Sequence, residues 1–146
     1  MKRRLSQEEE KQIVDAIRDA ELLTSGEIRV HIEARCKLNP LDRAAEVFVK
    51  LGMEKTRDRN GVLIYIALDD RKLAIAGDSG INQAVPDNFW NDTKSLMVAH
   101  FQEDRIAEGV KKAVLLAGEQ LGKYFPLKSD DSNELSNEIS RGDDIE

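Results

Sequence analysis

The clearest feature of the chain is a run of seven apolar residues, Val62–Leu68, between an Asn-Gly pair and an Asp-Asp pair. The run carries no charge and is rich in residues that favour strands, so it predicts a strand buried on both faces of a sheet. Residues 27–34 alternate polar and apolar side chains, which predicts a strand near the sheet edge with one face, including His31, in water. A shorter apolar segment, Leu73–Gly77, predicts a third strand.

Four other segments show the apolar spacing of amphipathic helices. Their starts carry ordinary helix-initiating signals, such as the capping box of Ser6 and Glu9 and the Asn-Pro pair at residues 39–40. Residues 78–85 are predicted to form a loop. The predicted helices extend from Ser6 to about Leu22, from Pro40 to Leu51 with Gly52 as the stop, from Pro86 through Phe101, and from Asp104 to Gly122.

The order of these elements predicts the fold. A strand, a helix and a buried strand in succession form a right-handed βαβ unit with parallel strands. The short turn at residues 69–72 returns the third strand as an antiparallel hairpin. We therefore expect an α/β protein, a three-layer α/β/α sandwich around a small mixed β-sheet.

Composition indicates one domain and excludes some partners. A chain of 146 residues with 40% hydrophobic and 34% charged residues is typical of one globular domain, predicted at residues 1–126. Residues 127–146 contain seven acids and two basic residues, a balance of −5, and predict an acidic disordered tail. The total of −6 then leaves about −1 for the domain, which disfavours nucleic acid as a partner.

The sequence also bears on compartment. Cys36 is the single cysteine, so an intramolecular disulfide cannot form. No stretch approaches the roughly 18 apolar residues of a membrane span, and an acidic segment follows the basic residues at the start of the chain. These features predict no membrane insertion and a cytoplasmic location.

Aspartates mark the ends of the predicted hairpin strands. With a hairpin, Asp58 and Asp78 share one end of the sheet and Asp69 and Asp70 the other, while Asp87 begins a helix. Clustered carboxylates around a sheet suggest a hard divalent cation such as Ca²⁺ or Mg²⁺. Each aspartate also has a structural explanation, as a turn residue, a helix-start acid or the partner of a neighbouring arginine.

Four motifs in this order resemble the TPM domain, a family that includes a thylakoid-lumen protein of photosystem II repair. The resemblance covers roughly residues 7–126. The motifs are Ser-Gly-Glu-Ile-Arg-Val at 25–30, Arg-Asn-Gly-Val-Leu-Ile at 59–64, Asp-Asp-Arg-Lys at 69–72, and Gly-Asp-Ser-Gly-Ile at 77–81 followed by Pro-Asp at 86–87.

The resemblance implies an α/β/α sandwich and a site for Ca²⁺ or another divalent cation on Asp69, Asp70, Asp78 and Asp87; Asp58 is added from the hairpin geometry alone. This chain departs from many exported relatives, which carry Gly-Tyr-Gly-Leu-Glu where it has Gly-Asp-Ser-Gly-Ile-Asn at residues 77–82. It resembles a cytosolic branch of the family, whose partners can differ from those of the exported members.

Three functions follow as hypotheses. The first is a metal-binding accessory module that acts on a protein partner without turnover. The alternative is a metal-dependent acid phosphatase, an activity described for plant relatives, in which Arg57, Arg59 or Arg71 would bind phosphate. No nucleophile or general base stands out in the sequence, so catalysis is the less favoured hypothesis. The third is a domain that presents its acidic tail to a basic partner.

Overall fold

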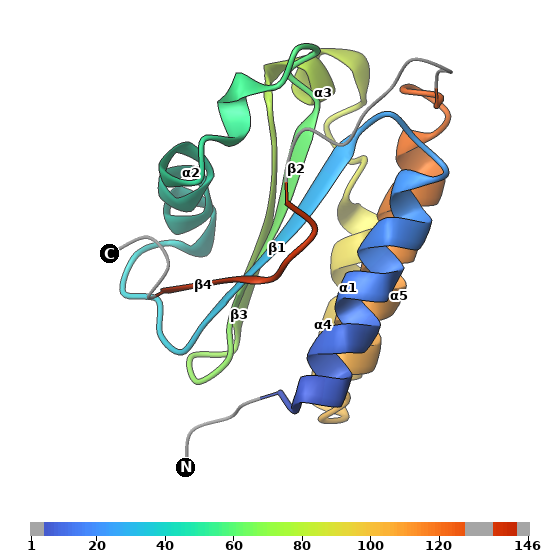
Figure 1. Ribbon diagram of the computed structural model, residues 1–146. Helices are drawn as coiled ribbons and strands as arrows, with labels where there is room; N and C mark the ends of the chain where they lie inside the picture. Colours follow the sequence, from blue (N-terminus) through green and yellow to red (C-terminus); the bar gives the residue numbers. More distant parts are fainter. Residues whose placement is uncertain (1–4, 128–135, 143–146) are drawn as a thin grey trace.

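A four-stranded mixed sheet forms the middle layer of the computed structural model, which describes residues 5–127 and 136–142 (Figure 1). The strand order is β3-β2-β1-β4. Within the described residues, no helix combines the length and the apolar character needed to cross a bilayer. The elements in chain order are α1 (Gln7–Glu21), β1 (Glu27–Glu33), α2 (Pro40–Lys50), η1 (Met53–Lys55), β2 (Gly61–Ala67), β3 (Lys72–Gly77), α3 (Ser79–Ala84), α4 (Asn91–Gln102), α5 (Ile106–Leu121) and β4 (Ser140–Arg141).

Helices cover both faces of the sheet unequally. Figure 1 shows α1, α4 and α5 together on one face and α2 on the other. The larger apolar core lies under the three helices and the smaller one under α2. All seven residues of β2 are buried because this strand lies between the two cores. The three-layer α/β/α sandwich is confirmed.

The strand pairing confirms the predicted topology. β1 and β2 are parallel, with Glu27 opposite Gly61, and α2 lies between them in the chain. β2 and β3 are antiparallel, with Ala67 opposite Lys72 at the turn. The start of β2 therefore lies beside the end of β3, and the carboxyl ends of both parallel strands lie beside the Asp-Asp turn.

Signals in the local sequence correctly predicted where the first two helices begin and end. Ser6 and Glu9 form the reciprocal capping box of α1. The Asn39 side chain accepts a hydrogen bond from the N–H of Leu41 at the start of α2. Gly52 adopts a φ of 70°, the left-handed conformation that favours glycine after a helix.

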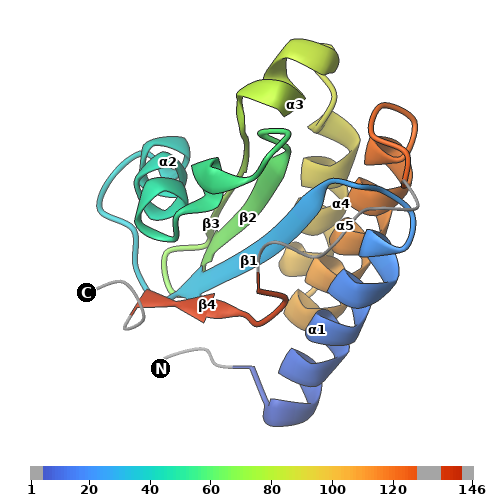
Figure 2. The ribbon, with the colours of Figure 1, turned by 45° about the horizontal axis from the view of Figure 1, so that its top comes forward.

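The segment between β3 and α5 differs from the prediction. Residues 79–84 form the short helix α3 (Figure 2) where a loop was expected. The Asp78 side chain caps this helix by accepting a hydrogen bond from the N–H of Ser79. Pro86 opens a turn, and α4 begins only at Asn91. Asp104 adopts a φ of 64° and does not cap the fourth predicted helix, which begins at Ile106.

Part of the predicted acidic tail belongs to the sheet. Strand β4 lies beside β1 (Figure 1) and pairs with it in parallel, with His31 opposite Ser140. Ile139 enters the larger core. The expected disorder is therefore wrong for residues 136–142, while residues 128–135 and 143–146 lie outside the described residues. β4 also covers the outer edge of β1, so His31 is buried and not exposed as predicted.

Candidate functional site

Asp78 lies at the end of β3 and is held by an arginine. Its two carboxylate oxygens each accept a hydrogen bond of 2.8 Å from the Arg59 guanidinium, and Oδ1 also accepts one of 2.7 Å from the N–H of Ser79. Burial acts to raise the pKa of Asp78, but the hydrogen bonds from Arg59 and Ser79 outweigh it and lower the pKa. Asp78 is therefore an ionised partner of Arg59 and the cap of α3.

The turn that carries Arg59 is packed against α3. Arg59 adopts a φ of 51°, uncommon for a residue other than glycine, and its carbonyl accepts a hydrogen bond of 2.9 Å from Gly80. A Cβ at Gly80 would lie 2.4 Å from the carbonyl oxygen of Asp58, so only glycine allows this approach. The Asp58 carboxylate faces Arg57 at 3.6 Å.

Two buried oxygens in the preceding segment have no hydrogen-bond partner among the described residues. They are Oε2 of Glu54, in η1, and Oδ1 of Asn60, just before β2. Buried polar atoms are nearly always satisfied, so these two call for an explanation. Both atoms are oxygens, the donor type that Ca²⁺ and Mg²⁺ prefer.

At the opposite end of the sheet, the Asp-Asp turn is fixed to the end of β1. The Asp70 carboxylate accepts a hydrogen bond of 2.7 Å from the N–H of Cys36, and the N–H of Asp69 donates to the carbonyl of Ala34 at 2.8 Å. Lys72 donates to the carbonyl of Cys36 at 3.0 Å. These bonds give Asp70 a structural role in positioning the turn.

The five predicted site residues lie in three separate places. Asp58 and Asp78 are separated from Asp69 and Asp70 by the length of β2, about 20 Å for seven residues. Asp87 is exposed in the turn before α4. In the described part of the chain, no three His, Cys, Asp or Glu side chains come together as a group that could hold a metal ion.

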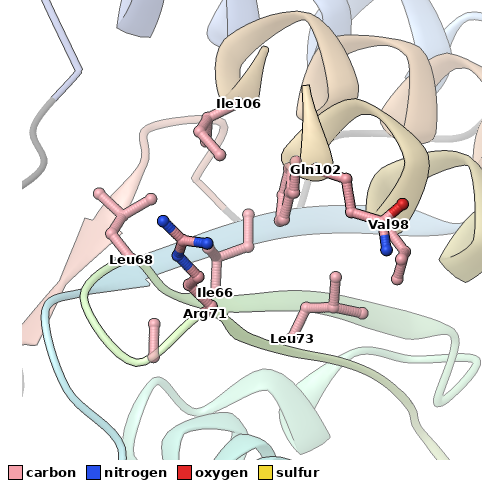
Figure 3. Close-up of a pocket in the computed structure, with 9 residues that line it drawn as sticks. Ile66, Leu68, Arg71, Leu73, Val98, Gln102 and Ile106 are labelled. Carbon is pink, nitrogen blue, oxygen red and sulfur yellow. The ribbon is translucent and has the colours of Figure 1, made fainter. Parts of the chain in front are cut away.

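A pocket opens beside the Asp-Asp turn, between the sheet and the helices α4 and α5 (Figure 3). Its volume is about 260 Å³. Among the nine described residues that line it, seven are apolar and Arg71 carries the only charge. They are Ile66, Ala67, Leu68, Arg71, Leu73, Val98, Phe101, Gln102 and Ile106.

Arg71 stands out in this lining. Among the described residues, its side chain makes no hydrogen bond or ion pair, although Asp69 and Asp70 precede it directly. Its backbone φ of 53° is again left-handed, a conformation that costs a non-glycine residue roughly 1–2 kcal/mol. Figure 3 places its guanidinium close to Leu68 and Ile66, among apolar side chains. An apolar cavity with one free cation can bind an apolar group that carries negative charge.

A buried polar network on the α2 side of the sheet was not predicted. Glu33 accepts two hydrogen bonds of 2.9 Å from Arg43, one from the Tyr65 hydroxyl, and faces Nε2 of His31 at 3.0 Å. Nδ1 of His31 faces the hydroxyl of Ser140 at 3.0 Å. Burial acts to raise the pKa of Glu33, but the hydrogen bonds from Arg43, Tyr65 and His31 lower it to about 2.

This network connects β4 to β1 and α2. The single polar residue within the apolar run of β2, Tyr65, was the sequence signal for it, because a buried hydroxyl needs a partner.

The described elements define an α/β/α domain built on a mixed sheet with one apolar, arginine-bearing pocket at the carboxyl end of its parallel strands. The chain belongs to the TPM domain family, whose model matches residues 2–120. The resemblance seen in the motifs is thereby confirmed. No curated protein matches the chain.

Three solved structures have the same fold. The NMR structure of the BA42 protein from the psychrophilic bacterium Bizionia argentinensis is 48% identical, covers 96% of this chain and 97% of its own, and has a TM-score of 0.90. The N-terminal domain of a P. gingivalis protein is 22% identical over 83% of this chain and 78% of its own, with a TM-score of 0.67. The N-terminal domain of the cg2496 protein from Corynebacterium glutamicum is 16% identical over 93% and 80%, with a TM-score of 0.62. The latter two show the fold alone.

Proposed function

We propose that this TPM domain is an accessory module that binds a protein partner through the pocket beside Arg71, without catalysis. The observation that carries the proposal is the pocket itself, an apolar pocket of about 260 Å³ whose lining includes the exposed Arg71, a side chain with no hydrogen-bond or ion-pair partner among the described residues. Ligands of open α/β sheets bind at the carboxyl ends of the parallel strands, which is where this cavity lies.

The character of the lining supports binding over turnover. Neither Arg71 nor Gln102 is a nucleophile or a general base at neutral pH, and the remaining lining residues are apolar. Removing an apolar side chain of a partner from water stabilises a complex by about 25 cal/mol per Å² of apolar surface. The pocket therefore offers binding energy and one charge.

Occupancy of the pocket is tested with a neutral probe, N-acetyl-phenylalaninamide, followed by amide NMR shifts of the full chain. We expect saturable shifts at residues 66–73 and 98–106. Val98→Trp places a large side chain at an exposed position of the lining and should abolish them. The matched control, Val49→Trp, changes an exposed valine of α2 and should leave them unchanged. Equal shifts in both variants would refute the proposal.

Divalent-cation binding is a second candidate function, favoured by the two buried oxygens of Glu54 and Asn60 that have no hydrogen-bond partner in the described part of the chain. We infer that Glu54, Asn60 and Asp78 would supply its oxygen ligands, and the ion would supply positive charge to order this end of the sheet. Asp69, Asp70 and Asp87 lie elsewhere in the fold, so cation binding by these three residues stays a separate prediction of the family resemblance. The alternative phosphatase activity also stays a prediction.

A Ca²⁺ titration of the full chain tests this second candidate. We expect saturable amide shifts at residues 54–60 and 78–80, weakened by Asp78→Asn and strengthened by Arg59→Gln, because the guanidinium competes for the Asp78 carboxylate. Asp87→Asn is the matched control, since Asp87 is exposed in the turn before α4, outside these loops. Identical titrations of the Asp78 variant and the wild type would remove Asp78 from the site.

A further inference from the structure

We propose that the pocket recognises the last residue of a partner chain, with the Arg71 guanidinium binding the terminal carboxylate and the cavity holding an apolar side chain. This inference rests on the proposed function and names the chemistry of the partner. It requires three properties of the pocket: an available positive charge, a volume that matches one side chain, and a short distance between the guanidinium and the apolar lining.

Among the described residues, no side chain forms an ion pair with the Arg71 guanidinium. Asp70 directs its carboxylate to the N–H of Cys36 and not to the neighbouring Arg71. A guanidinium favours carboxylates because its two parallel N–H donors match the two carboxylate oxygens. A pocket of this kind selects an anion over a neutral group.

The volume favours a single large side chain. A cavity of about 150 Å³ holds one benzene, whereas pockets for drug-sized ligands begin at about 300 Å³. The volume of about 260 Å³ lies between the two, which suits the side chain of Phe or Leu together with its backbone. The long acyl chain of a lipid would extend beyond it.

The position of Arg71 favours a carboxylate joined closely to the apolar group. Arg71 is exposed, and Figure 3 shows its guanidinium close to Ile66 and Leu68, at the solvent side of the apolar lining. In a C-terminal residue the carboxylate and the side chain share one Cα. In an extended internal segment, by contrast, an acidic side chain and its apolar neighbour point to opposite sides. A terminal residue therefore satisfies both requirements at once.

The test compares N-acetyl-phenylalanine with N-acetyl-phenylalaninamide, two probes of equal size that differ in the carboxylate. For the full chain we expect the acid to bind about tenfold more tightly, the usual gain from a charge-assisted hydrogen bond. Arg71→Asn should reduce this preference to less than twofold, and asparagine tolerates the left-handed backbone of residue 71. Arg57→Gln, which removes an exposed arginine near Asp58, is the matched control and should keep the preference.

The outcomes separate this inference from the proposed function. Equal binding of both probes, abolished by Val98→Trp, would overturn the carboxylate recognition and leave the pocket as an apolar site. Absence of binding by both probes would overturn the proposed function as well. Octanoate bound more tightly than N-acetyl-phenylalanine would refute a peptide terminus in favour of a fatty acid. A preference that survives in Arg71→Asn would assign the charge recognition to another residue.

Discussion

Glu21 makes the stability of the domain depend on pH in an unusual direction. It is the last residue of α1, and its carboxylate accepts a hydrogen bond of 3.2 Å from the N–H of Ile28. Burial raises its pKa from 4.5 to about 7; the bond from Ile28 opposes the rise and the charge of Glu27 adds to it. Because the folded-state pKa lies above the unfolded one, the folded state binds the proton more tightly. The stabilisation is complete below about pH 4.5 and is lost as the pH rises to about 7.

Replacing Glu21 with Gln removes this dependence and keeps the hydrogen-bond acceptor for Ile28. At roughly 1.4 kcal/mol per pKa unit, a shift from 4.5 to about 7 sets an upper limit of about 3 kcal/mol. Part of the carboxyl contacts water, which screens the effect. We therefore expect Glu21→Gln to raise the free energy of unfolding by about 1–2 kcal/mol at about pH 8 and to leave it unchanged near pH 4.5.

Urea unfolding followed by circular dichroism, repeated at intervals between about pH 4.5 and about pH 8, measures the difference. Glu119→Gln on α5 is the matched control, because Glu119 is exposed and its replacement should leave the curve parallel to the wild type. Parallel curves for wild type and Glu21→Gln over the whole range would refute the reasoning and show that the Glu21 carboxyl is solvated in the folded state.

Three further substitutions test other parts of the structure. Glu33→Gln should lower the free energy of unfolding at neutral pH by about 2–4 kcal/mol, because a neutral amide binds the Arg43 guanidinium less strongly than a carboxylate does. Measured by urea unfolding, the difference between the variant and the wild type should disappear as the pH falls from about 4.5 to about 2. Gly80→Ala should destabilise by about 1–3 kcal/mol in thermal melting, since its Cβ would lie 2.4 Å from the Asp58 carbonyl oxygen. Arg71→Gly should leave the free energy of unfolding in urea unchanged or raise it by up to about 1 kcal/mol, because glycine adopts a φ of 53° without strain. A clear loss of stability would contradict the claim that Arg71 serves binding.

The elements that the sequence predicted well are those set by neighbouring residues. The capping box at Ser6, the proline start of α2 and the uninterrupted apolar run of β2 each depend on a few adjacent positions. The order of strand, helix, strand and hairpin then fixed the topology, since the handedness of a parallel crossover leaves few alternatives.

The features that the sequence did not predict depend on partners far apart in the chain. His31 and Ser140 are 109 residues apart, and the segment around β4 is mostly polar, so its composition resembled disorder. Once β4 covers the edge of β1, His31 changes from an exposed residue to a buried one. The alternating pattern of residues 27–34 predicts one solvent-exposed face, because such a pattern does not reveal a partner strand.

Two arginines explain why residue types alone could not locate a site. One lies just before β2, and the other lies in the hairpin turn that follows β2. Arg59 and Arg71 both adopt a left-handed backbone, and each comes directly after an aspartate. Asp78, brought in from the end of β3, neutralises Arg59, whereas the described residues offer Arg71 apolar neighbours and no carboxylate. The same local motif therefore yields a structural ion pair at one end of the sheet and an available charge at the other. Since the backbone conformation is the same at both arginines, the charge without a partner among the described residues is what makes the Arg71 end the place where we expect a ligand to bind.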